Sequence, residues 1–293
     1  MADQEIRELT AETALTAAAQ FVVQESTDRA TRAAFSLMGG MAVTTGSDAD
    51  TTMAVGTLYR VDMSAWATSV RTYSLPTTAA VGERIGVYIT AGNATHELAI
   101  RTTASSNDTI NGTDYDAADW SKLFITGELA VFECVVANTD WIVLVDGRIP
   151  CHARADDVTG TAVSITAAVI TLTEQFDTGG IFNATSDRFL LRRDGRYTFE
   201  YNETTGAAID DTEYAVSNMY IDPDGADTQI FTDRPQSSAA NERVSHNWSY
   251  TRAYSDGDEI ELRLAVDTTG SNYTTGTSEN IRPKWSCWEV LEP

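Results

Sequence analysis

Residues 187–201 mix four arginines with large apolar side chains, but the apolar positions recur at every second residue. The alternating set is Phe189 and Leu191 before the Asp194-Gly195 turn, and Tyr197, Phe199 and Tyr201 after it. A period of two is that of a β-strand, whose neighbouring side chains point to opposite faces. The pattern predicts a strand, a turn and a second strand, forming a hairpin with one apolar face.

The same alternation continues through residues 160–293. In the segment 259–267 it places Ile260, Leu262, Leu264 and Val266 on one side of a predicted strand. Further alternating segments cover 214–222 and 248–254, and the apolar segment 284–293 predicts a buried final strand. About eight strands separated by turn residues are typical of a β-sandwich or jelly roll.

Residues 55–150 carry a second series of strand signals. Ile85, Val87 and Ile89 alternate, and two nearly continuous apolar runs, 128–136 and 141–145, flank a short turn. Strands covered on both faces have such runs. This segment therefore predicts a middle β domain, with a sandwich or barrel-like arrangement.

Residues 1–54 have a different character. An Ala-rich stretch favours helix, whereas 21–25 and 31–37 have the composition of short strands, so both alternatives stay open. Residues 39–52 are small and polar without periodicity, which is typical of a linker or extended arm. The predicted organisation is an all-β chain with an N-terminal arm (1–54), a middle β domain (55–150) and a C-terminal jelly-roll domain (160–293).

Charge narrows the classes of function. The 293 residues include 43 Asp and Glu against 20 Lys and Arg, a formal net charge of −23, and only Lys122 and Lys284 are lysines. A surface of this sign repels phosphate backbones, so we expect no nucleic-acid partner. Two interpretations of the acidity stay open. It keeps the protein soluble, or it suits a protein that functions at high salt, where repulsion between its own negative charges is screened. The sequence holds no apolar run long enough to span a membrane and no secretory signal at its start, so we expect no membrane partner.

Known catalytic motifs are missing from the sequence, and we expect no enzyme activity. The segment 222–227 offers Asp222, Asp224 and Asp227 to a Ca²⁺ ion, but it lacks the spacing and distal Glu of a calcium loop. An ordinary Pro-Asp-Gly turn is the preferred interpretation, so no cofactor or metal is expected.

Cys134 and Cys151 could bridge across a hairpin, although buried free thiols are the preferred state. The four arginines of 187–201 are expected to face solvent or to pair with acids of another subunit.

The C-terminal third resembles the jelly roll shared by tumour necrosis factor and the globular heads of complement. The resemblance is carried in order by E-Q-F-D-T-G-G-I-F-N (174–183), D-R-F (187–189), D-G-R-Y-T-F (194–199), A-Y-S-D-G-D-E-I-E-L (253–262) and the final W-E-V-L-E-P. A proline that the family carries before its Gly-x-Tyr turn is replaced here by Arg192-Arg193-Asp194. The resemblance implies a homotrimer. We expect its contacts and core to use six aromatic residues: Tyr197, Phe199, Tyr201, Trp248, Tyr250 and Trp288.

The beginning of the chain resembles the leader of bacteriophage fibre and decoration proteins, through E-L-T-A (8–11), F-V-V (21–23) and T-R-A-A-F (31–35). The middle segment is similar to β-modules of such fibres, through 108–113, 124–132 and the strand of Trp141. The resemblance implies a virion structural protein that is made in the bacterial host cytoplasm and attaches by its N-terminal arm. The anchoring residues implied are Leu9, Phe21, Val22, Val23, Arg32 and Phe35.

Two locations in the virion stay open. A capsid decoration (cement) protein or short head fibre, bound to the major capsid protein, is favoured because 293 residues without long repeats are few for a reaching fibre. The alternative is a tail fibre or receptor-binding protein whose C-terminal domain recognises a host surface glycan.

Overall fold

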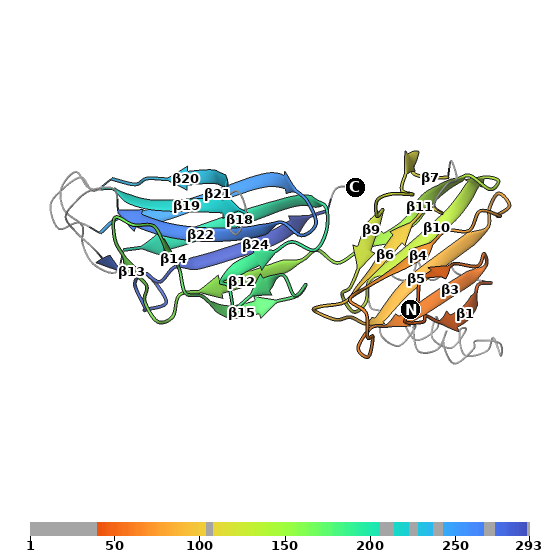
Figure 1. Cartoon of the computed structure of the whole chain (residues 1–293), viewed down its shortest axis with the longest axis horizontal. Helices are drawn as coiled ribbons and strands as arrows, with labels where there is room; N and C mark the ends of the chain where they lie inside the picture. Colours follow the sequence, from red (N-terminus) through yellow and green to blue (C-terminus); the bar gives the residue numbers. More distant parts are fainter. Residues whose placement is uncertain are drawn as a thin grey trace, which may run out of the picture. The chain divides into compact units, whose positions relative to one another are not determined.

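The computed structural model describes residues 40–103, 108–205, 214–222, 228–236, 243–266 and 273–291. Within these ranges the regular elements are all β-strands, which confirms the predicted all-β class (Figure 1). No helix in the described part of the chain has the length and apolar character needed to cross a membrane. The predicted anchoring residues of the N-terminal arm lie outside the described residues.

By their internal contacts the residues form two units. The first consists of Met1–Ala91, Ala99–Trp120 and Gly127–Arg148. The second consists of Gly92–Leu98, Ser121–Thr126 and Ile149–Pro293. Two short segments from the middle of the chain therefore belong, by contact, with the C-terminal unit.

The first unit is built on a seven-stranded sheet. Its strand order is β1 (Ala42–Thr45), β3 (Thr57–Asp62), β5 (Arg84–Ala91), β10 (Leu129–Val136), β11 (Asp140–Gly147), β7 (Thr109–Ile110) and β8 (Thr113–Asp114). β10 and β11 pair antiparallel, as predicted for the two apolar runs. Ile85, Val87 and Ile89 are fully buried, so their alternation marks the core side of β5.

A smaller sheet has four strands in the order β2 (Thr51–Thr52), β4 (Val70–Ser74), β6 (Glu97–Arg101) and β9 (Ser121–Leu123). Residues 39–52, interpreted from the sequence as a linker or extended arm, contain the two short strands β1 and β2. β1 pairs parallel with β3, and all four of its side chains are exposed. An edge strand without a buried face has no hydrophobic alternation, so it carries no strand signal in the sequence.

The second unit contains a five-stranded antiparallel sheet. Its order is β15 (Thr173–Asp177), β12 (His152–Asp156), β24 (Lys284–Val290), β18 (Gly195–Thr204) and β21 (Ser245–Tyr254). β12 begins eight residues before the predicted domain start at 160, and the unit itself resumes at Ile149. Ala153 and Ala155 are the buried apolar positions of β12, and such small side chains give a weak apolar pattern.

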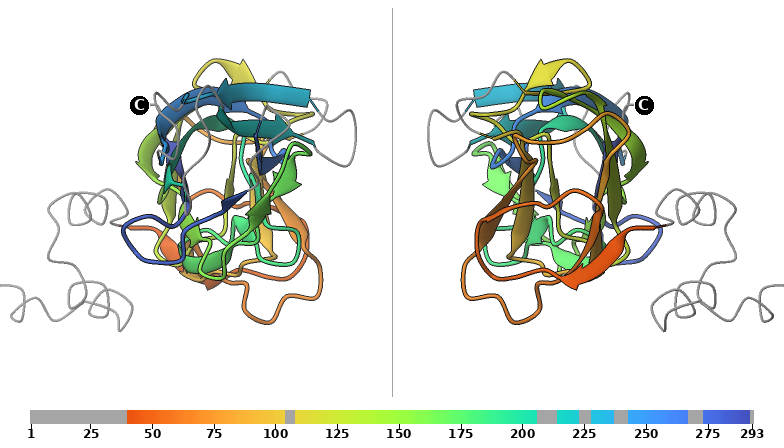
Figure 2. Two further views of the ribbon diagram at one scale, coloured as in Figure 1. Left: turned by 90° about the vertical axis from the view of Figure 1, so that its left-hand side faces the viewer. Right: turned by 90° about the vertical axis from the view of Figure 1, so that its right-hand side faces the viewer.

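The opposing sheet of this unit runs β16 (Phe182–Asn183), β17 (Arg188–Leu190), β22 (Glu259–Val266), β19 (Ala215–Ile221) and β20 (Thr228–Asp233), with β14 (Ala168–Val169) also paired to β22. A separate pair joins β13 (Ala162–Val163) to β23 (Tyr273–Thr274). Both views of Figure 2 separate β20, drawn in cyan, from β15, drawn in light green. Strands that alternate between two antiparallel sheets in this order form a jelly roll.

Aromatic side chains fill the space between the two sheets. Phe189 of β17 lies 4.5 Å from Trp285 of β24 and 5.8 Å from Phe199 of β18, measured between ring centroids. Ile260, Leu262, Leu264 and Val266 are buried, as their alternation predicted. Burial of each such side chain stabilises the fold by roughly 1.5–3 kcal/mol before the cost of lost chain entropy.

The predicted hairpin across 187–201 is wrong in its pairing. β17 and β18 are strands, and their apolar residues share the core, but β17 pairs with β16 and β22 whereas β18 pairs with β21 and β24. The turn at Asp194-Gly195 therefore carries the chain from one sheet to the other. Period-two alternation identifies the buried side of a strand and does not identify its partner.

Candidate association surface

The five-stranded sheet of the jelly roll has one face on the core and a second face that points away from it. Because neighbours along a strand point to opposite sides, the residues between the buried ones lie on this second face, the outer face. Cross-strand pairing places a row of four residues across it. The row is Thr251 of β21, Thr198 of β18, Trp288 of β24 and His152 of β12.

Three aromatic rings meet on the outer face. The ring centroid of His152 lies 4.6 Å from that of Phe176 and 6.1 Å from that of Trp288, and both contacts are edge-on. Phe176 is 39% exposed and Val290, two residues after Trp288, is 37% exposed. Contiguous apolar groups on a surface are typical of protein-interaction sites, so the outer face is a candidate association surface.

The outer face differs in charge from the chain as a whole. Its charged side chains are the cations Arg154, Arg196 and Lys284 and the acids Glu200 and Asp156, a balance of +3 and −2. The whole chain carries −23. Asp156 is buried, and its oxygens accept hydrogen bonds from Arg154 and Arg282. Two copies that meet through this face therefore escape most of the like-charge repulsion that their other surfaces impose.

A cavity of about 320 Å³ lies on the same face. Arg154, Glu200, Asn202, Asn247 and Lys284 are among the residues that line it. The outer face thus combines an apolar group with a polar depression, as protein interfaces commonly do.

The structure places the six predicted aromatic residues in three environments. Tyr197, Phe199, Tyr201 and Trp248 face the core and are buried. Tyr250 is half-buried, with its ring 5.1 Å from that of Phe231. Trp288 alone among the six lies on the outer face, where it is half-buried.

The four arginines of 187–201 have different outcomes. Arg196 is exposed, as the solvent-facing interpretation predicted. Arg192 and Arg193 correct the prediction, because both are buried within the second unit. Arg192 pairs with Glu97 at 2.8 Å, and Arg193 pairs with Glu289 at 3.0 Å. Arg188 likewise pairs within the chain, with Glu259 and Glu261. The local sequence could not predict these ion pairs, because the partners of Arg192 and Arg193 are more than ninety residues away along the chain.

Polar side chains are also buried between the sheets. The Nδ1 atom of His246 lies 3.1 Å from the Ser217 hydroxyl and 2.9 Å from an oxygen of Asp233. In a serine nucleophile relay the hydroxyl and the carboxylate contact different ring nitrogens. Here both lie at Nδ1 and the histidine is fully buried, so this group is not arranged for nucleophilic catalysis.

Glu203 stands directly across from His246 in the β18–β21 pairing. Its Oε2 atom accepts a hydrogen bond from the Tyr201 hydroxyl at 2.7 Å. Burial raises the pKa of Glu203, while the nearby His246 opposes that rise. The carboxyl group of Glu203 is therefore a titratable group inside the jelly-roll core, and its protonation changes the unfolding free energy of the protein.

The three cysteines are free and buried, so Cys134 and Cys151 do not form the bridge that was considered. Burial raises the pKa of the Cys287 thiol well above its usual value, which keeps it protonated and unreactive.

Within the described ranges no group of three or more His, Cys, Asp or Glu side chains is placed to hold a metal ion. Of the weak Ca²⁺ candidates, Asp222 directly follows β19, and its carboxylate accepts a hydrogen bond from the backbone N–H of Glu259. Asp224 and Asp227 lie outside the described residues.

Sequence analysis missed His152 and Phe176 as surface residues. His152 lies between the two predicted β domains, 55–150 and 160–293, where no strand was predicted. The signal that could have found it is the alternation H-A-R-A-D at 152–156, in which two alanines occupy the core side. Phe176 was noticed only as part of the resemblance to the jelly-roll family.

Together the fold and the outer face define an all-β chain with a C-terminal jelly roll and a candidate association surface. No family model matches the sequence, and no curated protein matches it. Among solved structures the chain is similar to murine APRIL at 11% identity, over 48% of this chain and 100% of that one, with a TM-score of 0.39. It is also similar to Eiger TNF from S. frugiperda at 11% identity, over 50% of this chain and 96% of that one, with a TM-score of 0.39. The jelly-roll description follows from strand order and pairing.

Proposed function

We propose that this protein is a homotrimeric structural protein of a bacteriophage virion, with no catalytic role. Its C-terminal jelly roll self-associates through the outer face, and its N-terminal arm attaches the trimer to the capsid. The observation that carries the proposal is the group of exposed His152 and Phe176 with half-buried Trp288, on a nearly neutral face of a strongly acidic chain.

Two physical effects support self-association through this face. Burial of apolar surface supplies the favourable free energy, at about 25 cal/mol per Å². A net charge of −23 opposes contact between copies wherever acids predominate. The number of subunits, three, comes from the resemblance of the C-terminal segment to trimeric jelly rolls.

The capsid assignment has separate support. The leader-like segments at 8–11, 21–23 and 31–35 resemble those of phage decoration proteins. Three arms on one trimer bind a lattice with avidity, because after the first arm binds, the others are held at high effective concentration. Weak individual anchors are then sufficient for stable attachment.

The mode of association is tested with charged substitutions on the outer face. Trp288→Glu and Phe176→Glu should convert the trimer to a monomer in analytical ultracentrifugation of the full chain. Ile165→Glu is the matched control, because Ile165 is 61% exposed and lies outside the outer face. A trimer that withstands both outer-face substitutions would refute this face as the interface, and a monomeric unmodified chain would refute the trimer.

Capsid attachment is tested separately. Phe21→Asp and Phe35→Asp should leave the trimer intact and abolish its sedimentation with capsids that lack the protein. Labelling of whole particles should then find the protein over the capsid lattice. A label confined to the tail would favour the receptor-binding alternative and overturn the decoration role.

A further inference from the structure

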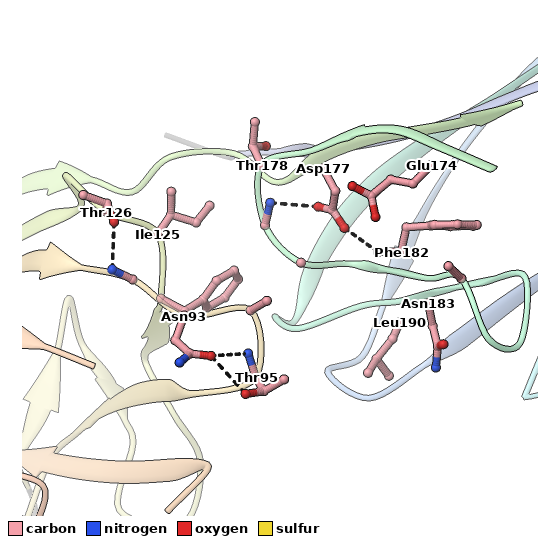
Figure 3. Close-up of a pocket in the computed structure, with 16 residues that line it drawn as sticks. Asn93, Thr95, Ile125, Thr126, Glu174, Asp177, Thr178, Phe182, Asn183 and Leu190 are labelled. Atoms are coloured by element: carbon pink, nitrogen blue, oxygen red, sulfur yellow. Dashed lines mark hydrogen bonds between the residues drawn. The ribbon is translucent and has the colours of Figure 1, made fainter. Parts of the chain in front are cut away.

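A cavity of about 670 Å³ that opens to solvent is lined by residues of the second unit, and the proposed function makes no use of it (Figure 3). One wall comes from the turn at 92–95 and the segment 124–126. The other comes from β15, from the Thr178–Gly180 turn and from the segment that follows, 182–184. The volume lies in the range typical of small-molecule sites.

A single buried guanidinium connects the two walls. Arg192 donates one hydrogen bond to the carbonyl of Asn93 at 3.2 Å and another to the carbonyl of Gly179 at 2.8 Å. Its side chain is only 4% exposed and it lies over the ring of Phe124, 4.0 Å from the centroid. Because one rigid group holds both walls, the cavity is formed before any ligand arrives.

The turns that form the walls are fixed in the same way. Asp177 accepts hydrogen bonds from the backbone N–H groups of Gly179 and Phe182, and Thr126 accepts one from Gly92 (Figure 3). Gly180 has a φ of +63°, and a Cβ atom there would lie 2.8 Å from Ala94. Only glycine permits this close approach.

A few polar groups in the lining have no partner within the described part of the chain. The carboxylate of Glu174 makes no hydrogen bond or ion pair there, and the Asn183 amide nitrogen is free although its oxygen accepts from Thr185. The Thr126 hydroxyl accepts from Gly92 and still has a proton to donate. The site thus offers one strong acceptor and two donors.

The rest of the lining decides what kind of ligand fits. Phe182, Leu190, Ile125, Ala94 and Ala184 supply apolar surface. The charged residues among the sixteen that line the cavity are Glu174 and Asp177, both acidic. An anionic ligand is therefore repelled, whereas a ligand with hydroxyl groups on an apolar ring frame meets both kinds of surface.

We propose that this cavity binds a neutral sugar, with Glu174 accepting from its hydroxyl groups, Asn183 and Thr126 donating to them, and the apolar residues packing on its ring. This inference does not depend on trimerisation or on attachment to a capsid. A neutral glycan on a cell surface is the natural source of such a ligand.

The test uses the full chain and saturation-transfer-difference NMR followed by titration. The probes are maltotriose, cellotriose, mannotriose and lactose, with 3′-sialyllactose as the charged counterpart of lactose. Glu174→Gln and Asn183→Ala should each weaken binding of the neutral probe about tenfold or more, which is the effect of losing a hydrogen bond to a polar or charged partner. Ala184→Trp should abolish binding by filling the cavity.

Matched controls are available on an exposed turn outside the cavity. Glu279→Gln and Asn280→Ala make the same chemical changes there and should leave binding unaltered. Near-ultraviolet circular dichroism confirms that each variant is folded. The proposal is overturned if none of the four neutral probes binds, if sialyllactose binds more tightly than lactose, or if cavity variants and controls bind alike.

Discussion

The buried ion pair between Arg193 and Glu289 gives the sharpest test of how the second unit is held together. The two side chains are 1% and 2% exposed, and a nitrogen of Arg193 lies 3.0 Å from Glu289 Oε2. The same guanidinium donates to the carbonyl of Lys122 at 2.6 Å and to that of Ile149 at 3.1 Å. Glu289 in turn accepts from the backbone N–H of Cys151 at 3.0 Å.

Arg193→Met removes the positive charge and leaves Glu289 buried without its partner. Breaking one side of a buried pair costs about 3–5 kcal/mol of unfolding free energy. Removing both partners, in Arg193→Met with Glu289→Leu, should cost less than the sum of the two single changes. We expect a coupling of about 2 kcal/mol or more, within the range of interacting neighbours.

The assay is urea unfolding at one fixed protein concentration, read by hydrogen exchange at the amides of β18 and β24. These strands belong to the second unit, so exchange there reports its stability rather than that of the first. An Arg193→Met variant that loses less than about 1 kcal/mol would show that the pair is not buried in the way the structure indicates. If the double variant loses as much unfolding free energy as the two single variants together, the predicted coupling is refuted.

Three further predictions concern charge, a buried carboxyl group and a glycine. Lowering the salt from about 1 M to about 0.05 M should lower the melting temperature of the trimer, because like charges are then less screened; melting that does not change across the titration would contradict this. Since burial raises the pKa of Glu203 above its usual 4.5, its contribution to stability is greatest below that pH and declines as pH rises through the folded-state value. Glu203→Gln should therefore flatten the dependence of unfolding free energy on pH above 4.5, and a slope equal to that of the unmodified chain would count against it. Gly180→Ala should lose about 1–3 kcal/mol more than Gly257→Ala, measured by thermal unfolding, because both glycines have positive φ but only Gly180 has a neighbour within 4 Å of the added Cβ.

Alternation in the sequence was sufficient to find most strands of the core. The segments around Ile260, Phe199 and Ile85 have one apolar face each, and all three residues are buried. The strands that were missed have another character. β1 has no buried face, and the apolar residues that β12 buries are alanines, so neither strand has the large apolar side chains on which a period can be recognised.

The candidate sites were harder to predict, because they depend on residues brought together from distant parts of the chain. Phe176 and Trp288 both contact His152, yet the three lie in separate strands whose order only the fold reveals. Arg192 joins Gly179, 13 residues before it, to Asn93, 99 residues before it. Long-range polar contacts leave no periodic trace, so sequence analysis assigned these arginines to solvent or to another subunit.

The proposed trimer is tested by the mass of the intact protein in solution, measured by light scattering during size-exclusion chromatography for the unmodified chain and for Trp288→Glu. We expect three times the 31.8 kDa of one chain for the unmodified protein and a single chain for the variant. A stable single chain for the unmodified protein, or a variant that keeps the full mass, would contradict it.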